Sequence, residues 1–345
     1  MNVIICATQV PFVRGGAEVL VDGLREALVA AGHRVDVVAL PFKWYPKEEI
    51  LKSALAWRLL DLTEANGMPV DAVICTKFPT WAVRHPRKIA WVVHQHRQAY
   101  DWFGTPLSDF TNSAEDVALR RRIAEIDRRG LGECVARFAI SGNVAARLKR
   151  SIGLEAEPLH VPIRLEGLEP VAYGDYILSV SRLDRAKRVE LLLEAMAEAG
   201  GDFRAVIAGD GPEAGSLRER AASLGLSERV TFTGRVSDSE LVRLYNEARA
   251  VFYSPVDEDF GLAAVEALTA GKPVVTVADA GGVLEFVEDG VTGLVSANAE
   301  PCSIAPILSR LMADEALARR LGAAGRERVA GLRWDRVVAR LLGHG

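Results

Sequence analysis

The sequence predicts an α/β protein made of two doubly wound parallel-sheet domains in tandem. Short apolar runs rich in Val and Ile alternate with amphipathic helical stretches along the chain, as in parallel sheets built from βαβ units. The 345 residues, 49% of them hydrophobic, are enough for two domains that each bury a core. Pro, Gly and Glu interrupt the periodicity around 158–173, and we place the boundary between residues 165 and 166.

The first domain begins with a βαβ unit. A buried strand at 3–7 leads through a loop containing Gly15 and Gly16 into a helix that ends near Gly32. Further strands are expected at 35–40, 70–75, 89–93 and 137–140. The second domain repeats the pattern, with strands expected at 176–181, 203–209, 230–233, 250–254, 274–277 and 293–295.

Composition excludes several classes of protein. A net charge of −4 gives no indication of a nucleic-acid partner. The four cysteines are far apart and form no C-x-x-C pair, so we expect buried thiols and neither a zinc site nor a disulfide framework. The chain has no run of 18 apolar residues and starts without a basic leader, and we therefore expect a cytoplasmic protein.

Basic residues gather in two places of the first domain. One group is Arg84, Arg87 and Lys88, and the other lies between 120 and 129. Such a face suits an anionic acceptor or the anionic inner surface of a membrane, where the protein would bind peripherally. The alternative is a solvated helix whose acidic residues offset these charges.

The segment 255–266 carries the strongest functional signal. Glu258 lies in a loop, and Glu266 follows eight residues later on the helix that the loop enters. Between them Phe260, Gly261 and Leu262 begin that helix, where free N–H groups and the helix dipole favour an anion such as a diphosphate. Glu258 would accept hydrogen bonds from sugar hydroxyls and Glu266 from ribose hydroxyls. The alternative is an amphipathic helix with two solvated glutamates.

This segment resembles the E-x7-E signature of retaining GT-B glycosyltransferases, most closely glycosyltransferase family 4, also called glycosyl transferases group 1. Other motifs of the family follow in the same order along nearly the whole chain. The resemblance implies a GT-B fold, in which two Rossmann-like domains face a central cleft. Residues 1–165 would bind the acceptor and 166–330 the nucleotide sugar. Residues 331–345 would form a helix that packs back on the first domain, although burial against its own domain would look the same in sequence.

The segment 181–188 follows a strand and matches a second family motif. Arg182 and Lys187 correspond to the R-x4-K pair that, by the resemblance, binds the donor diphosphate. A guanidinium and an ammonium neutralise the charge that develops on the departing nucleoside diphosphate. Arg185 and Arg188 lie outside the matched positions and are expected to be surface charges.

The remaining motifs are weaker. Gly15 and Gly16 match the glycine loop of the first domain, where backbone approaches the donor. His94 ends a strand and aligns with the histidine that contacts the transferred sugar, with a packed or capped histidine as the alternative; His96 would meet the acceptor. Gly209, Gly211, Gly234 and Arg235 match segments around the donor's base and ribose. Trp102 and Phe103 indicate an exposed acceptor loop or, equally, core or lid packing.

The resemblance implies a hexosyltransferase that works without a metal or other cofactor. Asp257, Glu258 and Asp259 have the D-x-D spacing of metal-dependent glycosyltransferases of another fold, but Arg182 and Lys187 supply positive charge instead. The partners expected are a UDP- or GDP-sugar and an acceptor hydroxyl on a glycan, glycolipid or small metabolite. Alternatives are a disaccharide phosphorylase or synthase of the same fold and a non-catalytic sugar-nucleotide-binding subunit. The oligomeric state stays open.

Overall fold

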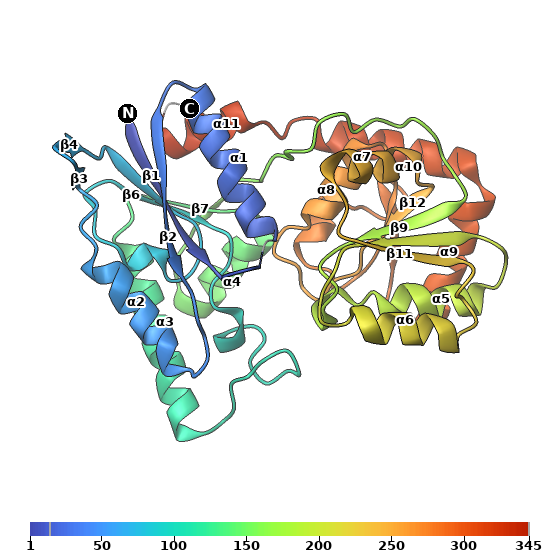
Figure 1. The fold of residues 1–345 in the computed structure, drawn as a ribbon, viewed down its shortest axis with the longest axis horizontal. Helices are drawn as coiled ribbons and strands as arrows, with labels where there is room; N and C mark the ends of the chain where they lie inside the picture. The colour runs from blue at the N-terminus through green and yellow to red at the C-terminus, as the bar shows by residue number, and fades with distance from the viewer. Residues whose placement is uncertain (14, 344–345) are drawn as a thin grey trace. The chain divides into compact units, whose positions relative to one another are not determined.

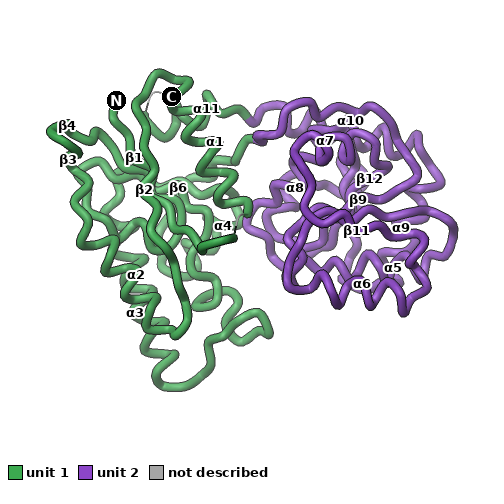
Figure 2. Tube along the Cα trace, viewed as in Figure 1, with its two compact units in different colours: residues 1–162, 333–345 green, residues 163–332 purple. Residues whose placement is uncertain are grey.

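The computed structural model describes residues 1–13 and 15–343. Contacts between residues divide the chain into two compact units, shown in Figure 2. Unit 1 comprises residues 1–162 and 333–345, and unit 2 comprises residues 163–332. The predicted α/β class with two parallel sheets is confirmed. The first division falls three residues before the predicted boundary, and the predicted cleft stays a prediction.

Unit 1 is built on a six-stranded sheet in the order β2-β1-β5-β6-β7-β8, with every pair parallel. Its strands are β1 (Asn2–Gln9), β2 (Arg34–Pro41), β5 (Ala72–Cys75), β6 (Lys88–Val92), β7 (Ala136–Ala139) and β8 (Glu157–Pro158). The central strands β5 and β6 are buried along their whole length, as expected of a sheet covered on both faces. A two-residue hairpin of β3 (Glu64–Ala65) and β4 (Met68–Pro69) was not predicted.

Helices cover both faces of this sheet (Figure 1). The helix α1 (Gly16–Ala30) packs with α11 (Trp334–Leu342) on one face, while α2 (Glu48–Leu59), α3 (Ala114–Gly132) and α4 (Gly142–Ile152) lie on the other. Two short 3-10 turns, η1 (Thr80–Ala82) and η2 (Arg97–Ala99), follow β5 and β6.

The C-terminal helix α11 is part of unit 1. Its Trp334 ring lies over Gly23 of α1, so closely that a Cβ atom at Gly23 would come within 2.4 Å of the ring. The same ring meets Trp91 of β6 edge to face at 6.1 Å between centroids. The Arg87 guanidinium donates to the carbonyl oxygen of Leu342 at 2.6 Å. The last helix therefore completes the core of the unit in which the chain begins.

Unit 2 also has a six-stranded parallel sheet, in the order β11-β10-β9-β12-β13-β14, with two strands on the outer side of its first strand β9 where unit 1 has one. Its strands are β9 (Tyr176–Val180), β10 (Arg204–Ala208), β11 (Val230–Gly234), β12 (Ala250–Phe252), β13 (Val274–Val277) and β14 (Gly293–Ser296). On one face lie α5 (Glu190–Ala199), α6 (Ala214–Ser223) and α9 (Pro301–Ala313), and on the other lie α7 (Asp238–Glu247), α8 (Leu262–Thr269) and α10 (Glu315–Val329). The turns η3 (Arg185–Lys187) and η4 (Gly282–Glu285) complete the unit.

Each sheet has one topological switch point, where consecutive connections leave in opposite directions. It lies between β1 and β5 in unit 1 and between β9 and β12 in unit 2. Ligands of doubly wound sheets bind at the carboxyl ends of the strands at such points. The loops that follow these four strands are therefore where a site is expected.

Two expectations about single residues are wrong. Cys6, Cys75 and Cys134 are buried thiols, but Cys302 is exposed because it lies in the first turn of α9, whose buried face is formed by Ile304, Ala305 and Leu308. Lys88 does not join a basic surface. It is buried at the start of β6, where its ammonium donates to the carbonyl oxygens of Trp81 and Val83 and pairs with Glu133. Across the described residues, no helix is both long and apolar enough to cross a bilayer.

Candidate active site

A lysine and a glutamate meet at the switch point of unit 2. Lys187 ends the η3 turn after β9, and Glu258 lies in the loop after β12, so neighbouring parallel strands bring together residues 71 positions apart. The Lys187 ammonium pairs with Glu258 Oε2, and the Tyr253 hydroxyl donates to the same oxygen at 2.9 Å. Both charged side chains are largely buried.

The surroundings of this pair fix the charge of the lysine. Burial alone favours the neutral amine, but the negative charge of Glu258 outweighs it and raises the pKa of Lys187. Burial and the same carboxylate raise the pKa of the Tyr253 hydroxyl. Lys187 is therefore a permanent, half-enclosed cation at the carboxyl edge of the sheet, next to a carboxylate that accepts hydrogen bonds.

The three arginines of the 181–188 segment differ in environment. Arg182 is exposed, with its Nε 4.0 Å from Asp184 Oδ2. Arg185 is also exposed and lies 3.5 Å from Glu213, as expected of a surface charge. The prediction for Arg188 is wrong, because its side chain is only 13% exposed.

Arg188 acts as a clamp on the neighbouring loops. Its guanidinium donates to the carbonyl oxygens of Ser254 and Pro255, each at 2.8 Å, and pairs with Asp279 at 2.6 Å. Its own backbone is left-handed, with φ near 50°. By joining the loops after β9, β12 and β13, Arg188 fixes the segment from which Glu258 extends.

The start of α8 lies directly after Glu258. Gly261 is the N-cap residue with φ of 90°, and a Cβ atom there would come within 2.7 Å of Val283, so only glycine fits without strain. Gly261 O accepts from the N–H groups of Ala264 and Val265, which leaves those of Leu262 and Ala263 outside the helix ladder. The Phe260 ring packs edge to face on Phe286. The turn is therefore firmly held and directs N–H groups outward, as an anion site requires.

Glu266 lies one turn into α8 and is buried, in contrast to the alternative of two solvated glutamates. The Tyr245 hydroxyl of α7 donates to its Oε2 at 2.9 Å. Burial raises the pKa of Glu266 to about 7, although the Tyr245 hydrogen bond opposes this. Near neutral pH this side chain therefore changes between a hydrogen-bond donor and an acceptor-only carboxylate.

The two glycines after β10 have packing roles. A Cβ atom at Gly209 would lie 1.9 Å from the carbonyl oxygen of Ser181, and one at Gly211 would lie 2.3 Å from that of Leu183. These two glycines therefore let the β10 loop press against the segment that carries Arg182. Gly234 is left-handed with open space around it, and Arg235 beside it is exposed.

The switch point of unit 1 also holds a lysine and a glutamate, which sequence reasoning missed. Glu18 lies in the first turn of α1, and its Oε2 accepts from the N–H of Gly15 at 2.8 Å. Its Oε1 pairs with Lys77 Nζ at 2.9 Å, from the loop after β5. Gly15 and Gly16 thus begin α1 beside this pair. The position of Lys77, two residues after a buried strand, was the available signal.

The two histidines after β6 have different surroundings. His94 is half-buried, and its ring Nδ1 donates to the carbonyl oxygen of Gln95 at 2.7 Å. His96 is buried among the rings of Phe42, Phe78 and Phe110, with Nε2 unpartnered among the described residues. Burial lowers the pKa of His96 to about 4, with the charge of His94 acting in the same direction. An acceptor contact by His96 stays a prediction, and the ring packs as a neutral core group.

Trp102 and Phe103 are half-buried and each carries an arginine on its ring. The Arg97 guanidinium lies 4.3 Å from the centre of the Trp102 ring, and that of Arg120 lies 3.4 Å from the centre of the Phe103 ring. Asp101 pairs with Arg97 at 2.5 Å. The loop is thus ordered by stacking, in keeping with the packing alternative, and its acceptor role stays a prediction.

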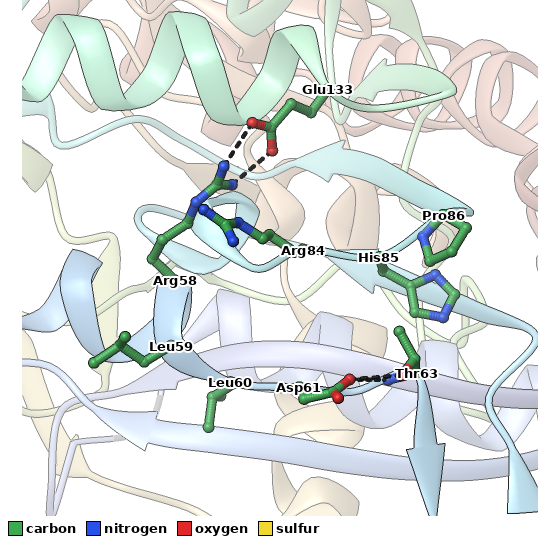
Figure 3. A pocket seen from close by; sticks show the side chains of 9 residues that line it. All are labelled: Arg58, Leu59, Leu60, Asp61, Thr63, Arg84, His85, Pro86 and Glu133. Atoms are coloured by element: carbon green, nitrogen blue, oxygen red, sulfur yellow. Dashed lines mark hydrogen bonds and ion pairs between the residues drawn. The ribbon is translucent and has the colours of Figure 1, made fainter.

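A pocket of about 590 Å³ lies elsewhere in unit 1 (Figure 3). Residues just before β6 and after α2 line it, so it opens at the amino ends of the strands, away from the switch point. The lining is Arg58, Leu59, Leu60, Asp61, Thr63, Arg84, His85, Pro86 and Glu133. Arg58 and Glu133 pair with one another across it at 2.7 Å. Within residues 1–13 and 15–343, no three His, Cys, Asp or Glu side chains are grouped as a metal would need.

Known structures define the fold class of the whole chain. Sucrose-phosphate synthase from Thermosynechococcus elongatus matches with a TM-score of 0.75 at 23% identity, covering 99% of this chain and 97% of its own. The Anabaena protein HepE, solved in complex with UDP-glucose, matches with a TM-score of 0.73 at 17% identity and 99% coverage of both chains. The protein therefore has the predicted GT-B fold.

The match to a known family lies in the second unit. Residues 171–328, nearly all of unit 2, match the family Glycosyl transferases group 1. D-inositol 3-phosphate glycosyltransferase of Nocardia farcinica is 36% identical over 188 residues, which are 51% of this chain and 41% of that protein. The protein of the same name from Frankia alni is 36% identical over 181 residues, 49% of this chain and 44% of its own. The chain thus spans less than half the length of these relatives. Unit 2 is thus the part of the chain that matches glycosyl transferases group 1.

Proposed function

We propose that this protein transfers a hexose from a UDP-sugar to an acceptor hydroxyl, with retention of configuration at the anomeric carbon. The family match of residues 171–328 supports the class of reaction. HepE in complex with UDP-glucose makes UDP the first nucleotide to test. The observation that carries the proposal is the Lys187–Glu258 pair at the β9/β12 switch point, because it joins a fixed cation to a sugar-binding carboxylate.

The cations of unit 2 act on the leaving group. In the proposed reaction the bond between the anomeric carbon and the diphosphate oxygen breaks, and negative charge develops on the UDP. Lys187 neutralises that charge in this proposal, together with Arg182, whose side chain is exposed. The N–H groups at the start of α8 complete the diphosphate cradle. No metal ion is required in this scheme.

Two carboxylates orient the donor. Glu258 accepts from hydroxyls of the transferred sugar, and Glu266, with Tyr245 behind it, accepts from the ribose hydroxyls. His94 would contact the transferred sugar, as the resemblance implies. The acceptor oxygen forms the new glycosidic bond on the face that the diphosphate leaves, and its proton passes to a departing phosphate oxygen. Positioning and electrostatics therefore provide the rate, without a covalent nucleophile.

The acceptor follows from the relatives only as a first candidate. Curated relatives act, by their names, on D-inositol 3-phosphate. This compound is therefore the first acceptor to test, with glycans, glycolipids and other small metabolites after it. Residues 1–162 would bind it, in the cytoplasm.

Thermal unfolding with nucleotides tests the proposal first. UDP, GDP and their sugars are added with EDTA present, to the natural protein and to Glu266→Ala. A nucleotide at about 100 times its Kd should add roughly 2.7 kcal/mol to the free energy of unfolding. We expect stabilisation by UDP that persists in EDTA and weakens in Glu266→Ala.

Other outcomes separate the alternatives. Stabilisation that requires a divalent ion would overturn the metal-free scheme. Nucleotide binding without UDP release, for every acceptor in the panel, would favour a non-catalytic sugar-nucleotide-binding subunit. No stabilisation by any nucleotide would overturn the transferase and favour a phosphorylase of the same fold.

A further inference from the structure

Asp127, in the middle of α3, is a fully buried carboxylate held only by neutral groups. The Trp81 indole N–H donates to Oδ1 at 2.9 Å. The Gln95 side-chain amide donates to Oδ2 at 3.0 Å, and the Tyr100 hydroxyl donates to the same oxygen at 2.7 Å. No cation is among these partners, unlike Asp116 on the same helix, which pairs with Lys47.

The three donors come from the two loops that form the carboxyl edge of unit 1. Trp81 lies in η1 after β5, Gln95 lies in the loop after β6, and Tyr100 ends η2. The Gln95 carbonyl accepts from the His94 ring, and its side-chain Oε1 accepts from the Ser151 hydroxyl of α4. One carboxylate therefore joins the β5 and β6 loops, and Gln95 extends the connection to α4.

Burying a carboxylate without a cation beside it costs free energy of folding. An uncompensated buried carboxylate loses its hydration, and an apolar side chain would fill the same space without that loss. The carboxylate fixes the orientation of three side chains, because its two oxygens accept from three donors that would otherwise rotate independently. The segment so fixed, 94–100, includes His94 and leads into Trp102.

We propose that Asp127 is a positioning residue for sugar transfer, which holds the 94–100 segment where His94 meets the transferred sugar. This inference rests on the proposed function. Asp127 does not touch substrate in this proposal; it acts through Gln95, Tyr100 and Trp81. Its loss should therefore reduce the rate of transfer and leave nucleotide binding to unit 2 unchanged.

The test is Asp127→Asn, which keeps the size of the side chain and replaces one acceptor oxygen by an NH2 group that faces donors. With the UDP-sugar and the acceptor of the panel, D-inositol 3-phosphate first, that give UDP release with the natural protein, we expect kcat to fall about 10- to 100-fold, as for a misplaced reacting group. The Kd for UDP should stay within about twofold, because uniform binding is untouched. Tyr100→Phe, which removes one hydrogen-bond donor, should also lower kcat, by a smaller factor, and should also leave the Kd for UDP unchanged.

Glu133→Gln is the matched control. Glu133 caps the same helix and pairs with Lys88 and Arg58, but at the opposite end of the sheet. It should lower the unfolding temperature without changing kcat beyond about twofold. Equal kcat in Asp127→Asn, Tyr100→Phe and the natural protein overturns the inference, as does a loss of kcat in Glu133→Gln as large as that in Tyr100→Phe. A natural protein that binds UDP but transfers nothing overturns the proposed function and this inference with it.

Discussion

The two units of this protein each put a lysine and a glutamate at the switch point of a six-stranded parallel sheet. Unit 2 holds Lys187 and Glu258 at the β9/β12 switch point, and unit 1 holds Lys77 and Glu18 at the β1/β5 switch point. In both units, loops from neighbouring strands bring the charges together. Sheet topology therefore accounts for where these charges lie in both units.

The partners of the two glutamates show how different their tasks are. Glu258 lies in a loop, and its Oε2 accepts from the side chains of Lys187 and Tyr253, while its Oε1 accepts from the N–H of Asp259. Glu18 divides its oxygens between Lys77 and the N–H of Gly15, and so caps α1. Strand order fixes where the two carboxylates lie, while their partners differ: Glu18 caps a helix, and Glu258 is held by two side chains of the loops around it. The family match covers the unit that holds Glu258.

The largest expected effect is on Lys187. Lys187→Ala should lower kcat about 100- to 1,000-fold, because in the proposed reaction this cation neutralises the departing diphosphate. Initial rates of UDP release measure this, and nucleotide-free unfolding verifies that the variant is folded. Arg185→Ala, in the same turn but 75% exposed, is the control and should keep its rate. A rate for Lys187→Ala close to that of Arg185→Ala would contradict the role proposed for Lys187, and with it the functional difference between the two lysine–glutamate pairs.

The pH dependence of stability should separate Glu266 from other carboxylates. Its folded-state pKa of about 7 exceeds the ordinary value of 4.5. The folded protein therefore keeps a proton that the unfolded chain has released, and stability from this group is fully present below pH 4.5. It is lost as pH rises through 7, by up to about 3 kcal/mol.

Urea unfolding at pH 5 and pH 8 measures this loss. Glu266→Gln, which cannot ionise, should lose less stability between the two values than the natural protein does. Parallel profiles for the two proteins would mean that Glu266 is ionised throughout, against the burial that raises its pKa.

A smaller effect concerns the helix that closes unit 1. Gly23→Ala places a methyl group against the Trp334 ring and should destabilise the unit by about 1–3 kcal/mol, as overpacking does. Gly132→Ala, at the end of α3 with open space around it, should be neutral or slightly stabilising. Differential scanning calorimetry compares the two. Equal unfolding temperatures would contradict this prediction and would show that α11 can shift away from the added methyl group without a loss of stability.

The smallest effect is expected at Lys77. Lys77→Ala removes an ion pair that supports a helix cap, and should lower the free energy of unfolding by about 1 kcal/mol. Stabilisation by UDP should be the same as in the natural protein. A loss of UDP binding in Lys77→Ala would mean that the lysines at both switch points support nucleotide binding, and would contradict the difference proposed between the two units.

Sequence patterns predicted most of the fold because buried strands and helix starts are local signals. The strand expected at 274–277 is β13 itself, and the short β3–β4 hairpin was missed because two-residue strands have no periodicity. The motif positions in unit 2 do meet at one edge, since that follows from strand order. The burial of single charged side chains could not be predicted from the sequence, because the partners of Arg188 and Glu266 lie far from them along the chain.

The division of the chain also affects how it is made. Unit 2 is one continuous stretch, residues 163–332, whereas unit 1 needs both residues 1–162 and the closing helix after 333. During synthesis, domains fold as the chain emerges. The first unit to emerge must wait with the α1 surface around Gly23 uncovered, while the second has all its residues once Leu332 has been translated. In this protein, order of synthesis and order of completion are therefore reversed.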